Sequence, residues 1–418
     1  MKTKSIIVTL VFAIAFSAFG ENGKKEELAF IKENTLFAQQ QLSLMIKTLP
    51  DPDTANIETL VPYSIDSNGK LATCGKYWWT IGFFPGSLWK LYELSGDKLW
   101  LNQAQRWTNR LEYLKTFTGN HDLGFMVYCS FGNALKLAPK PQYKDIIIES
   151  ARSLSTRFNP KTSVIKSWNS YKGWDGKTVC YYPVIIDNMM NLELLCEASK
   201  MSNNPTFKNI AVTHANTTLK NHFRKDYSTY HVVDYDTITG EVKHKITSQG
   251  YSDNSTWARG QAWAIYGYTM MYRETKEASY LKTASAAADY FLKNLPEDGI
   301  PWWDFNVGQE GFTPGENSYA LNNPQKVKDA SAAAITCSAL FELGQLAGKP
   351  AYTQAAIRML HTLASPAYRA APGGNTNFIL MHCVGSFAHK SNIDTPMDYA
   401  DYYFLESLAR YKKILENN

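Results

Sequence analysis

Two aspartates, Asp122 and Asp187, stand about 65 residues apart, and an apolar segment with helical spacing begins at each of them. Apolar neighbours exclude water from a carboxyl group and raise its pKa, so that the acid stays protonated near neutral pH. A pair of such groups can protonate a sugar substrate and activate water. The pattern therefore indicates sugar chemistry. The alternative is that both residues are helix N-caps, a position that also favours aspartate.

Other carboxylates compete for these roles, although most of them stand among Gly, Asn and Thr residues that are typical of turns. They are Asp234, Asp236, Asp253, Asp304 and Asp401. Asp304 is the strongest rival because it follows two tryptophans. Among the cations, Arg259 lies between Trp257 and Trp263, and its planar, permanently charged fork suits a substrate carboxylate. A structural salt bridge is the alternative for Arg259.

The composition indicates a folded protein with a large core and disfavours several functions. The 418 residues are 44% hydrophobic and 19% charged, enough for one large domain or two ordinary ones. The formal charge of +5 is small and no Lys/Arg cluster occurs in the body of the chain. Nucleic acid is therefore not an expected partner, whereas an anionic small substrate is compatible. Without paired histidine spacing or a C-x-x-C motif, no metal site is expected.

The N-terminus has the pattern of a secretory signal peptide, a basic start followed by an apolar run over 6–16 and small residues near position 20. We expect residues 1–20 to be cleaved and 21–418 to form one domain, exported to the periplasm and not held in a membrane. The first cysteine is Cys74, which disfavours a lipid anchor. The six cysteines are widely spread and are interpreted mostly as buried small hydrophobes, with a disulfide left open.

Apolar residues recur at helical spacing in twelve segments, and strand-like alternation is scarce outside the loops. The segments are 24–47, 82–94, 97–115, 123–137, 142–156, 185–200, 204–221, 256–274, 277–294, 327–347, 350–364 and 399–415. Short connections with Gly or Pro alternate with long loops, at about 48–81, 157–184, 222–255, 295–326 and 365–398. Helical hairpins of this kind predict an all-α toroid, in which six pairs close an (α/α)6 barrel. An open helical solenoid is the alternative.

In such a barrel the inner helices begin at the long-loop end. Both aspartates then lie at that end, at the starts of inner helices. The segments that begin at Trp79 and at Trp257 lie there as well. Four distinctive segments thus converge on one end of the barrel, which favours a functional site over four unrelated caps.

Seven motifs occur in order along nearly all of the mature chain. They are Trp79-Thr80-x-Gly82-Phe83, His121-Asp122-Leu123-Gly124-Phe125, Ile186-Asp187-x-Met189-Met190-Asn191, His231, Gln249-Gly250-Tyr251-Ser252-Asp253, Trp257-x-Arg259-Gly260-Gln261-Ala262-Trp263 and Asp401-Tyr402-Tyr403-Phe404-Leu405-Glu406. The set resembles the unsaturated glucuronyl hydrolases of glycoside hydrolase family 88. That resemblance implies an (α/α)6 barrel without metal or organic cofactor. It also implies removal of a 4,5-unsaturated glucuronic acid from the non-reducing end of lyase-generated glycosaminoglycan oligosaccharides, by hydration of the C4=C5 vinyl ether.

By the same resemblance, Asp187 is expected to be the general acid/base, which gives a proton to C4 and helps water to add at C5. Asp122 has a supporting role, since an ionised carboxylate stabilises the oxocarbenium-like cation that protonation creates. Residues that match positions around the unsaturated sugar are His121, Trp168, His231, Gln249, Arg259 and Trp263, with Trp79 as a stacking wall. The match of Trp168 rests on a shorter motif, residues 165–169.

Two other functions stay open. An unsaturated rhamnogalacturonyl or ulvan-type hydrolase shares the barrel and the mechanism but takes a different second sugar. A noncatalytic sugar-binding helical protein would not need both aspartates. The segment 385–391, Gly-Ser-Phe-Ala-His-Lys-Ser, offers hydroxyls and a cation for a sulfate, yet it does not clearly match the Ser-x-x-Ser-x-Lys pattern associated with sulfated substrates. The sequence leaves the sulfation pattern, the linkage and the oligomeric state open.

Overall fold

Helices make up most of the computed structural model, which describes residues 20–417. Twelve α-helices lie in this part of the chain. Their bounds are α2 (Glu21–Thr48), α3 (Phe83–Ser95), α4 (Lys98–Asn109), α5 (Asn133–Leu137), α6 (Pro141–Ser155), α7 (Leu192–Ser202), α8 (Pro205–His222), α9 (Ala258–Thr275), α10 (Ala278–Lys293), α11 (Ala330–Ala347), α12 (Pro350–Leu363) and α13 (Asp398–Glu416). The π-helix η3 (Gly124–Gly132) runs into α5, and the 3-10 helix η4 (Ile186–Asn191) runs into α7. The predicted signal peptide lies, apart from Gly20, outside the described residues.

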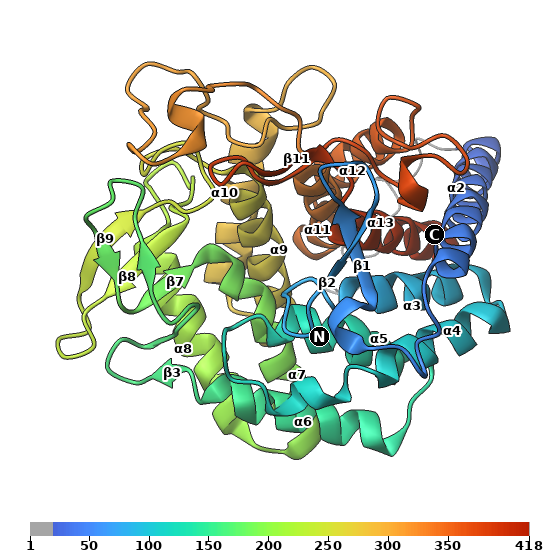
Figure 1. The fold of residues 1–418 in the computed structure, drawn as a ribbon, viewed down its shortest axis with the longest axis horizontal. Helices are drawn as coiled ribbons and strands as arrows, with labels where there is room; N and C mark the ends of the chain where they lie inside the picture. The colour runs from blue at the N-terminus through green and yellow to red at the C-terminus, as the bar shows by residue number, and fades with distance from the viewer. Residues whose placement is uncertain (1–19, 418) are drawn as a thin grey trace, which may run out of the picture.

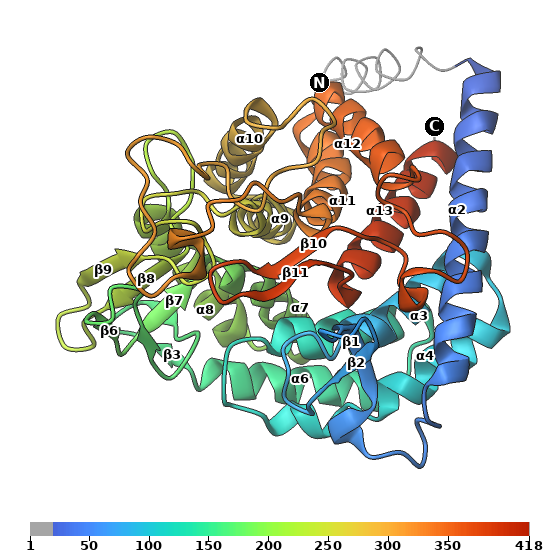
Figure 2. The same ribbon diagram turned by 45° about the horizontal axis from the view of Figure 1, so that its top comes forward.

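The inner helices form a closed ring, seen face-on in Figure 1 and tilted in Figure 2. Following the chain, the ring consists of α3, η3 with α5, η4 with α7, α9, α11 and α13, and α13 packs back against α3. The helices α4, α6, α8, α10, α12 and α2 lie outside, each packed against an inner helix. The predicted (α/α)6 barrel is therefore confirmed, and the open solenoid is excluded because the two ends of the array meet.

Short turns connect the helices at one end of the barrel, as the sequence predicts. Gly96 and Gly348 end α3 and α11 in the left-handed conformation, with φ of 71° and 61°. Asp97 then caps α4 by accepting a hydrogen bond from the Leu99 N–H at 2.8 Å. Pro350 occupies the first turn of α12, where no backbone N–H is needed. Local residue chemistry alone accounts for these helix ends.

The long loops at the other end contain short antiparallel strands that the sequence pattern did not predict. They are β1 (Val61–Ile65), β2 (Leu71–Cys74), β3 (Phe158–Asn159), β4 (Val164–Ile165), β5 (Tyr171–Lys172), β6 (Val179–Cys180), β7 (Pro183–Ile185), β8 (Val232–Tyr235), β9 (Val242–Ile246), β10 (Cys383–Ser386) and β11 (Ser391–Thr395). Most of them form two-stranded hairpins, whereas β7, β8 and β9 form a three-stranded sheet. Strands of two to five residues are too short to show a clear alternation of apolar and polar residues.

Two predicted helices have different ends in the structure. The segment 97–115 leaves the α-helical conformation after Asn109 and ends in the 3-10 helix η2 (Glu112–Thr116). The segment 185–200 begins as the last residue of β7 and continues as η4 before α7 starts. Ile185 cannot be helical because its backbone pairs with Val232 in β8. Tertiary pairing therefore overrides the helical pattern at this point.

One continuous apolar core fills the ring. All six cysteines are buried and free, so the chain has no disulfide and the cysteines act as small apolar side chains. Among the described helices, only α11 is long and apolar enough to cross a membrane. Because 78% of that helix is buried inside the barrel, its apolar composition is explained by core packing.

Candidate active site

Asp122 and Asp187 come together at the long-loop end of the ring. Asp122 precedes η3 and Asp187 lies in η4, and neither helix has a side-chain cap, so the N-cap alternative is wrong for both residues. Asn191 in η4 accepts a hydrogen bond from the Phe125 N–H at 3.2 Å. Gly124 lies so close to Asn191 that a Cβ atom there would collide with it. The two segments that carry the aspartates are thereby held side by side.

Burial makes both carboxyl groups weak acids. Asp122 is 7% exposed and Asp187 is 6% exposed. Burial, and then the charge of Asp187, raise the pKa of Asp122 to about 8, against an opposing effect of Arg157. Burial raises the pKa of Asp187 to about 7, although Arg259 and the indole of Trp263 favour its ionised form. The pair therefore holds at least one proton near neutral pH, as acid/base chemistry requires.

His231 presents a neutral N–H group to Asp187. Strand pairing brings it there, because the His231 carbonyl accepts a hydrogen bond from the Ile186 N–H at 3.0 Å. Its Nδ1 accepts the backbone N–H groups of Ser248 and Gln249, both at 3.1 Å. The proton must then be on Nε2, which lies 3.7 Å from Asp187 Oδ2. Since burial lowers the pKa of His231 well below its ordinary value, the ring is an uncharged donor.

His121 stands in the same relation to Asp122. The Oδ1 atom of Asn191 accepts the Phe125 N–H, so the amide nitrogen of Asn191 faces His121 Nδ1, at 3.5 Å. The Ser167 hydroxyl is 3.3 Å from the same Nδ1. The His121 proton therefore belongs on Nε2, which lies 3.2 Å from Asp122 Oδ1. Burial lowers the pKa of His121 to about 3. The side chain has no exposed surface, so it supports Asp122 from behind and does not reach the opening.

Arg259 is occupied by acceptors of the protein itself. It is 1% exposed and forms a buried ion pair with Asp329 at 3.2 Å. It also donates to the carbonyls of Val384 and Gly385, and to Gln249 Oε1 at 2.7 Å. The salt bridge that was the sequence-based alternative is therefore present. A direct contact of Arg259 with a substrate carboxylate stays a prediction, as does that of Gln249.

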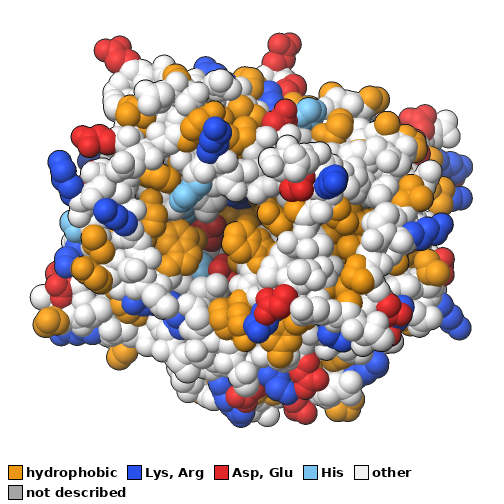
Figure 3. Space-filling model, viewed as in Figure 1, with side chains coloured by type: hydrophobic (Ala, Val, Ile, Leu, Met, Phe, Trp, Pro, Cys, Tyr) orange, Lys and Arg blue, Asp and Glu red, His pale blue; other side chains and the backbone are white. Residues whose placement is uncertain are grey.

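Two tryptophans lie near the segments that carry the two carboxyls. Trp168 is half-buried and lies edge-on to His231, with ring centroids 6.3 Å apart. Trp79 is also half-buried and packs on Tyr399 at 5.0 Å. Trp263 has no exposed surface, and its indole favours the ionised form of Asp187, so its contact with a substrate stays a prediction. Figure 3 shows the opening near the centre of this face, with hydrophobic side chains on both sides and acidic and histidine side chains inside it.

Proteins of known family share the sequence and the fold of this chain. A model of Glycosyl Hydrolase Family 88 matches residues 56–403. The chain belongs to Glycosyl Hydrolase Family 88. The resemblance inferred from the seven motifs is thereby confirmed, and the protein is a glycosidase.

Relatives in family 88 match along most of the chain. An unsaturated glucuronyl hydrolase of Formosa agariphila is 50% identical over 341 residues, which cover 81% of this chain and 80% of that protein. An unsaturated chondroitin disaccharide hydrolase of Streptococcus pyogenes is 32% identical, covering 80% and 81%. The crystal structure of an unsaturated glucuronyl hydrolase specific for heparin superposes with a TM-score of 0.82 and 41% identity, covering 93% of this chain and 98% of that chain. The similarity therefore extends over the barrel as a whole.

The competing carboxylates have structural roles in this family 88 barrel. Asp304 accepts the Tyr251 N–H at 2.8 Å and a serine hydroxyl at 2.6 Å. Asp401 accepts the N–H groups of Ile379 and Leu380, both at 2.9 Å. The other three each accept at least one backbone N–H group in the long loops. Their oxygens therefore hold loops in place.

Two residues at the site escaped the sequence reasoning. Trp257 lies against the His231 ring with centroids 4.5 Å apart, and the Arg259 guanidinium lies 4.5 Å from the Trp257 ring. Its place in the Trp257-to-Trp263 motif was the available signal. In the sequence, Asp329 resembles an ordinary helix N-cap. It does cap α11, since it accepts a hydrogen bond from the Ser331 N–H at 3.1 Å. Among the described residues, no group of three His, Cys, Asp or Glu side chains is placed to hold a metal.

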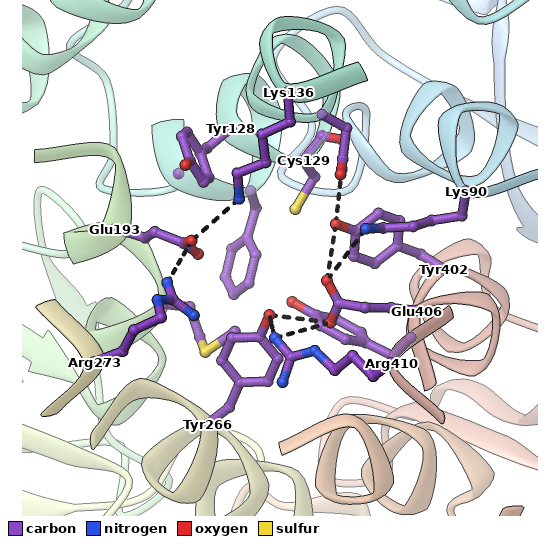
Figure 4. A pocket seen from close by; sticks show the side chains of 15 residues that line it. Lys90, Tyr128, Cys129, Lys136, Glu193, Tyr266, Arg273, Tyr402, Glu406 and Arg410 are labelled. Atoms are coloured by element: carbon purple, nitrogen blue, oxygen red, sulfur yellow. Dashed lines mark hydrogen bonds and ion pairs between the residues drawn. The ribbon is translucent and has the colours of Figure 1, made fainter. Parts of the chain in front are cut away.

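A second cavity, of about 70 Å³, lies deeper in the barrel and is lined by charged residues from the later turns of the inner helices (Figure 4). Arg273 pairs with Glu193 at 2.6 Å, and Lys90 lies 3.8 Å from Glu406. The Tyr266 hydroxyl donates to Glu406 at 3.0 Å. Arg273 and Arg410 also pair with Glu342, at 2.7 and 2.8 Å, so this network of ion pairs joins neighbouring inner helices.

Proposed function

We propose that this family 88 protein releases the 4,5-unsaturated glucuronic acid from the non-reducing end of lyase-generated oligosaccharides by hydrating its C4=C5 bond. The observation that carries the proposal is the buried pair Asp122 and Asp187, whose carboxyl pKa values lie near neutrality and each of which faces a neutral histidine. Such a pair can donate a proton and stabilise a cation. The relatives named for unsaturated glucuronyl and chondroitin disaccharide hydrolysis support this reaction class.

Asp187 supplies the proton in this proposal. Its Oδ2 is buried, lies 3.7 Å from His231 Nε2 and has no hydrogen-bond partner among the described residues, so no hydrogen bond of Oδ2 within the protein has to break when the carboxyl gives up its proton. Protonation of C4 turns the vinyl ether into an oxocarbenium-like cation shared by C5 and the ring oxygen. Water adds at C5 and gives a proton back to the Asp187 carboxylate. The resulting hemiketal opens and releases the remaining sugar as an alcohol.

Asp122 balances the positive charge of that cation. The pKa of Asp122, about 8, lies above that of Asp187, about 7, so a single proton shared by the pair rests mainly on Asp122. Because the charge of Asp187 is one cause of the raised pKa of Asp122, Asp122 ionises more readily in the state in which Asp187 is protonated. The state with Asp187 protonated and Asp122 ionised is the one the reaction needs. His231 Nε2–H then faces Asp187 Oδ2 and stabilises the carboxylate that proton transfer leaves behind.

The second sugar is proposed to be that of a glycosaminoglycan fragment. Relatives are named for chondroitin and for heparin substrates, which differ in that sugar and in sulfation. At the loop between β10 and β11, His389 and Lys390 are exposed, and the Ser386 hydroxyl lies 2.6 Å from His389 Nδ1. These groups are available to a sulfate. Unsaturated rhamnogalacturonan and ulvan fragments are the alternative substrates.

The decay of ultraviolet absorbance from the conjugated double bond tests the proposal. Unsaturated disaccharides from chondroitin, hyaluronan and heparin form the panel, together with pectin and ulvan fragments. We expect decay with a glycosaminoglycan disaccharide and a loss of about 10²- to 10⁴-fold in rate for Asp187→Asn. Asp236→Asn, in a surface turn, is the matched control and should keep the wild-type rate. Stable absorbance across the panel would sink the proposal, and a wild-type rate for Asp187→Asn would refute the acid/base assignment.

We also infer that the protein is exported to the periplasm after residues 1–20 are removed. The basic start and the apolar run over 6–16 support this inference. Cleavage after Gly20 leaves α2 intact, because that helix begins at Glu21. N-terminal sequencing of the protein from a periplasmic fraction should start at or near Glu21. A periplasmic protein that retains the first twenty residues, or its absence from that fraction, contradicts the inference.

A further inference from the structure

We infer that Arg157 is a positioning residue that holds the loop of Trp168 against the segment that carries Asp122. The inference rests on the proposed function, because it assigns both residues to one reaction. Arg157 lies two residues after the end of α6 and is half-buried. It lines a surface hollow with Thr118, Lys166 and Tyr182, none of which is expected to touch a substrate, so we expect any effect on a substrate to pass through the groups that it holds.

The guanidinium of Arg157 joins two loops that are distant in the sequence. Its hydrogen bonds are Nε to the Lys166 carbonyl at 2.8 Å, Nη1 to the Thr118 carbonyl at 2.6 Å, Nη2 to the Ser167 carbonyl at 3.3 Å, and weaker contacts from Nη1 and Nη2 to Asn169 Oδ1 at 3.5 and 3.4 Å. Three of these acceptors flank Trp168 on both sides. The fourth, Thr118, belongs to the segment that leads to Asp122. Only a planar fork with five N–H groups can bind all of them at once.

Ser167 transmits this clamp to the catalytic pair. Its carbonyl, which accepts from Arg157, also accepts the His121 N–H at 3.2 Å. Its hydroxyl lies 3.3 Å from His121 Nδ1 and accepts the Ile185 N–H at 3.0 Å. The Trp168 loop, the Asp122 segment and strand β7 therefore meet at Ser167. A displacement of Ser167 would move Trp168 and disturb the histidine behind Asp122.

Arg157 also contributes an unpaired charge. Carbonyl and amide oxygens, not carboxylates, accept all its side-chain hydrogen bonds within the described chain. Three ionisable groups surround Asp122. The charge of Asp187 raises the pKa of Asp122, the charge of Arg157 lowers it, and the neutral His121 lies against the carboxyl. Removal of the Arg157 charge should therefore raise the pKa of Asp122 further.

Three variants separate the geometric effect from the electrostatic one. Arg157→Lys keeps the charge but loses the fork, Arg157→Met loses both, and Asn169→Ala removes one acceptor and keeps the charge. The control is Arg152→Met, because Arg152 is an exposed arginine of α6 paired only with Glu149 at 2.7 Å. Michaelis constants and pH profiles are measured with the substrate that the wild-type enzyme turns over fastest. Hydrogen exchange of the amides at 166–169 is measured without substrate.

We expect Arg157→Lys and Arg157→Met to raise KM about 3- to 10-fold, since the Trp168 wall is displaced. Only Arg157→Met should move the acid limb of the kcat/KM profile upward, by about half a pH unit to one unit. Should Arg157→Met fail to fold, the increase in KM for Arg157→Lys and Asn169→Ala, with an unmoved pH profile, tests the clamp. Equal losses of kcat in both Arg157 variants with no change in KM or in the pH profile would mean a purely structural role and overturn the inference.

The exchange measurement keeps this test separate from the proposed function. Amides at 166–169 should exchange at least about tenfold faster in Arg157→Met than in Arg152→Met. Equal exchange in the two variants overturns the clamp even if the enzyme is active. A wild-type enzyme that turns over no unsaturated sugar refutes the proposed function. Faster exchange of amides 166–169 in Arg157→Met would still show, in that case, that Arg157 holds the loop.

Discussion

Replacement of Asp187 by Asn should stabilise the protein at alkaline pH while lowering its activity about 10²- to 10⁴-fold. Burial raises the pKa of this carboxyl from 3.8 to about 7. At ~1.4 kcal/mol per pKa unit, keeping Asp187 ionised therefore costs the folded state about 4 kcal/mol relative to the unfolded chain. Asn has nearly the same shape as a protonated Asp and never ionises. It avoids this cost at every pH.

The sign of the effect follows from proton uptake. Between pH 4 and pH 7 the unfolded chain has released the Asp187 proton while the folded protein retains it, so folding takes up a proton. The contribution of Asp187 to stability is then largest below pH 4 and is lost as the pH rises through 7. Relative to wild type, Asp187→Asn should gain almost nothing near pH 4 and about 4 kcal/mol at pH 8.

Thermal unfolding at pH 5, 6, 7 and 8 measures this difference. An unfolding entropy of about 2.1 cal/mol/K per residue converts 4 kcal/mol into a Tm increase of about 5 °C for a chain of 418 residues. Asp236→Asn is the matched control with the opposite sign, because backbone N–H groups of Thr239 and Ile238 lower the pKa of Asp236. A Tm difference between Asp187→Asn and wild type that is the same at pH 5 and pH 8 would refute the reasoning.

Two further predictions concern the surroundings of the pair. Asp329→Ala leaves the buried Arg259 without its partner and should lower the free energy of unfolding by about 3–5 kcal/mol in urea titrations. A loss below 1 kcal/mol would show that the three remaining acceptors suffice. Trp168→Ala should raise KM about 3- to 10-fold with little change in Tm, since the ring is half-buried. A wild-type KM would remove Trp168 from the substrate wall.

Helix positions could be predicted because most helix ends are determined by neighbouring residues. The turn from Gly96 to Asp97 ends α3 and caps α4 with two adjacent residues, and both ends lie within one residue of the predicted ones. The pattern fails where a distant segment decides the conformation. Ile185 belongs to a strand because of its pairing with Val232, 47 residues later, and nothing local to Ile185 carries that information.

The position of the site could be predicted because the barrel brings the starts of the inner helices to one end. Asp122 and Asp187 had to share one end because both lie at the starts of inner helices. The partner of Arg259 was not predictable, since Asp329 reads as an ordinary N-cap and lies 70 residues away. The role of Arg157 was hidden for a different reason. It binds mostly backbone carbonyls, which every residue has, so no partner side chain marks it in the sequence.

The carboxyls of Asp122 and Asp187 face neutral donors, and the arginines act on them only at longer range. An arginine in direct contact would lower the pKa of a carboxyl by about 1–3 units, and Asp187 would then have no proton to give near neutral pH. His231 avoids this because burial keeps the ring uncharged, and the two backbone N–H groups that bond to its Nδ1 direct Nε2–H at Asp187. Asn191 and Ser167 orient His121 toward Asp122 in the same way. The cost is carboxyls that resist ionisation, so the arrangement that supplies the proton is also the one that weakens the fold as the pH rises.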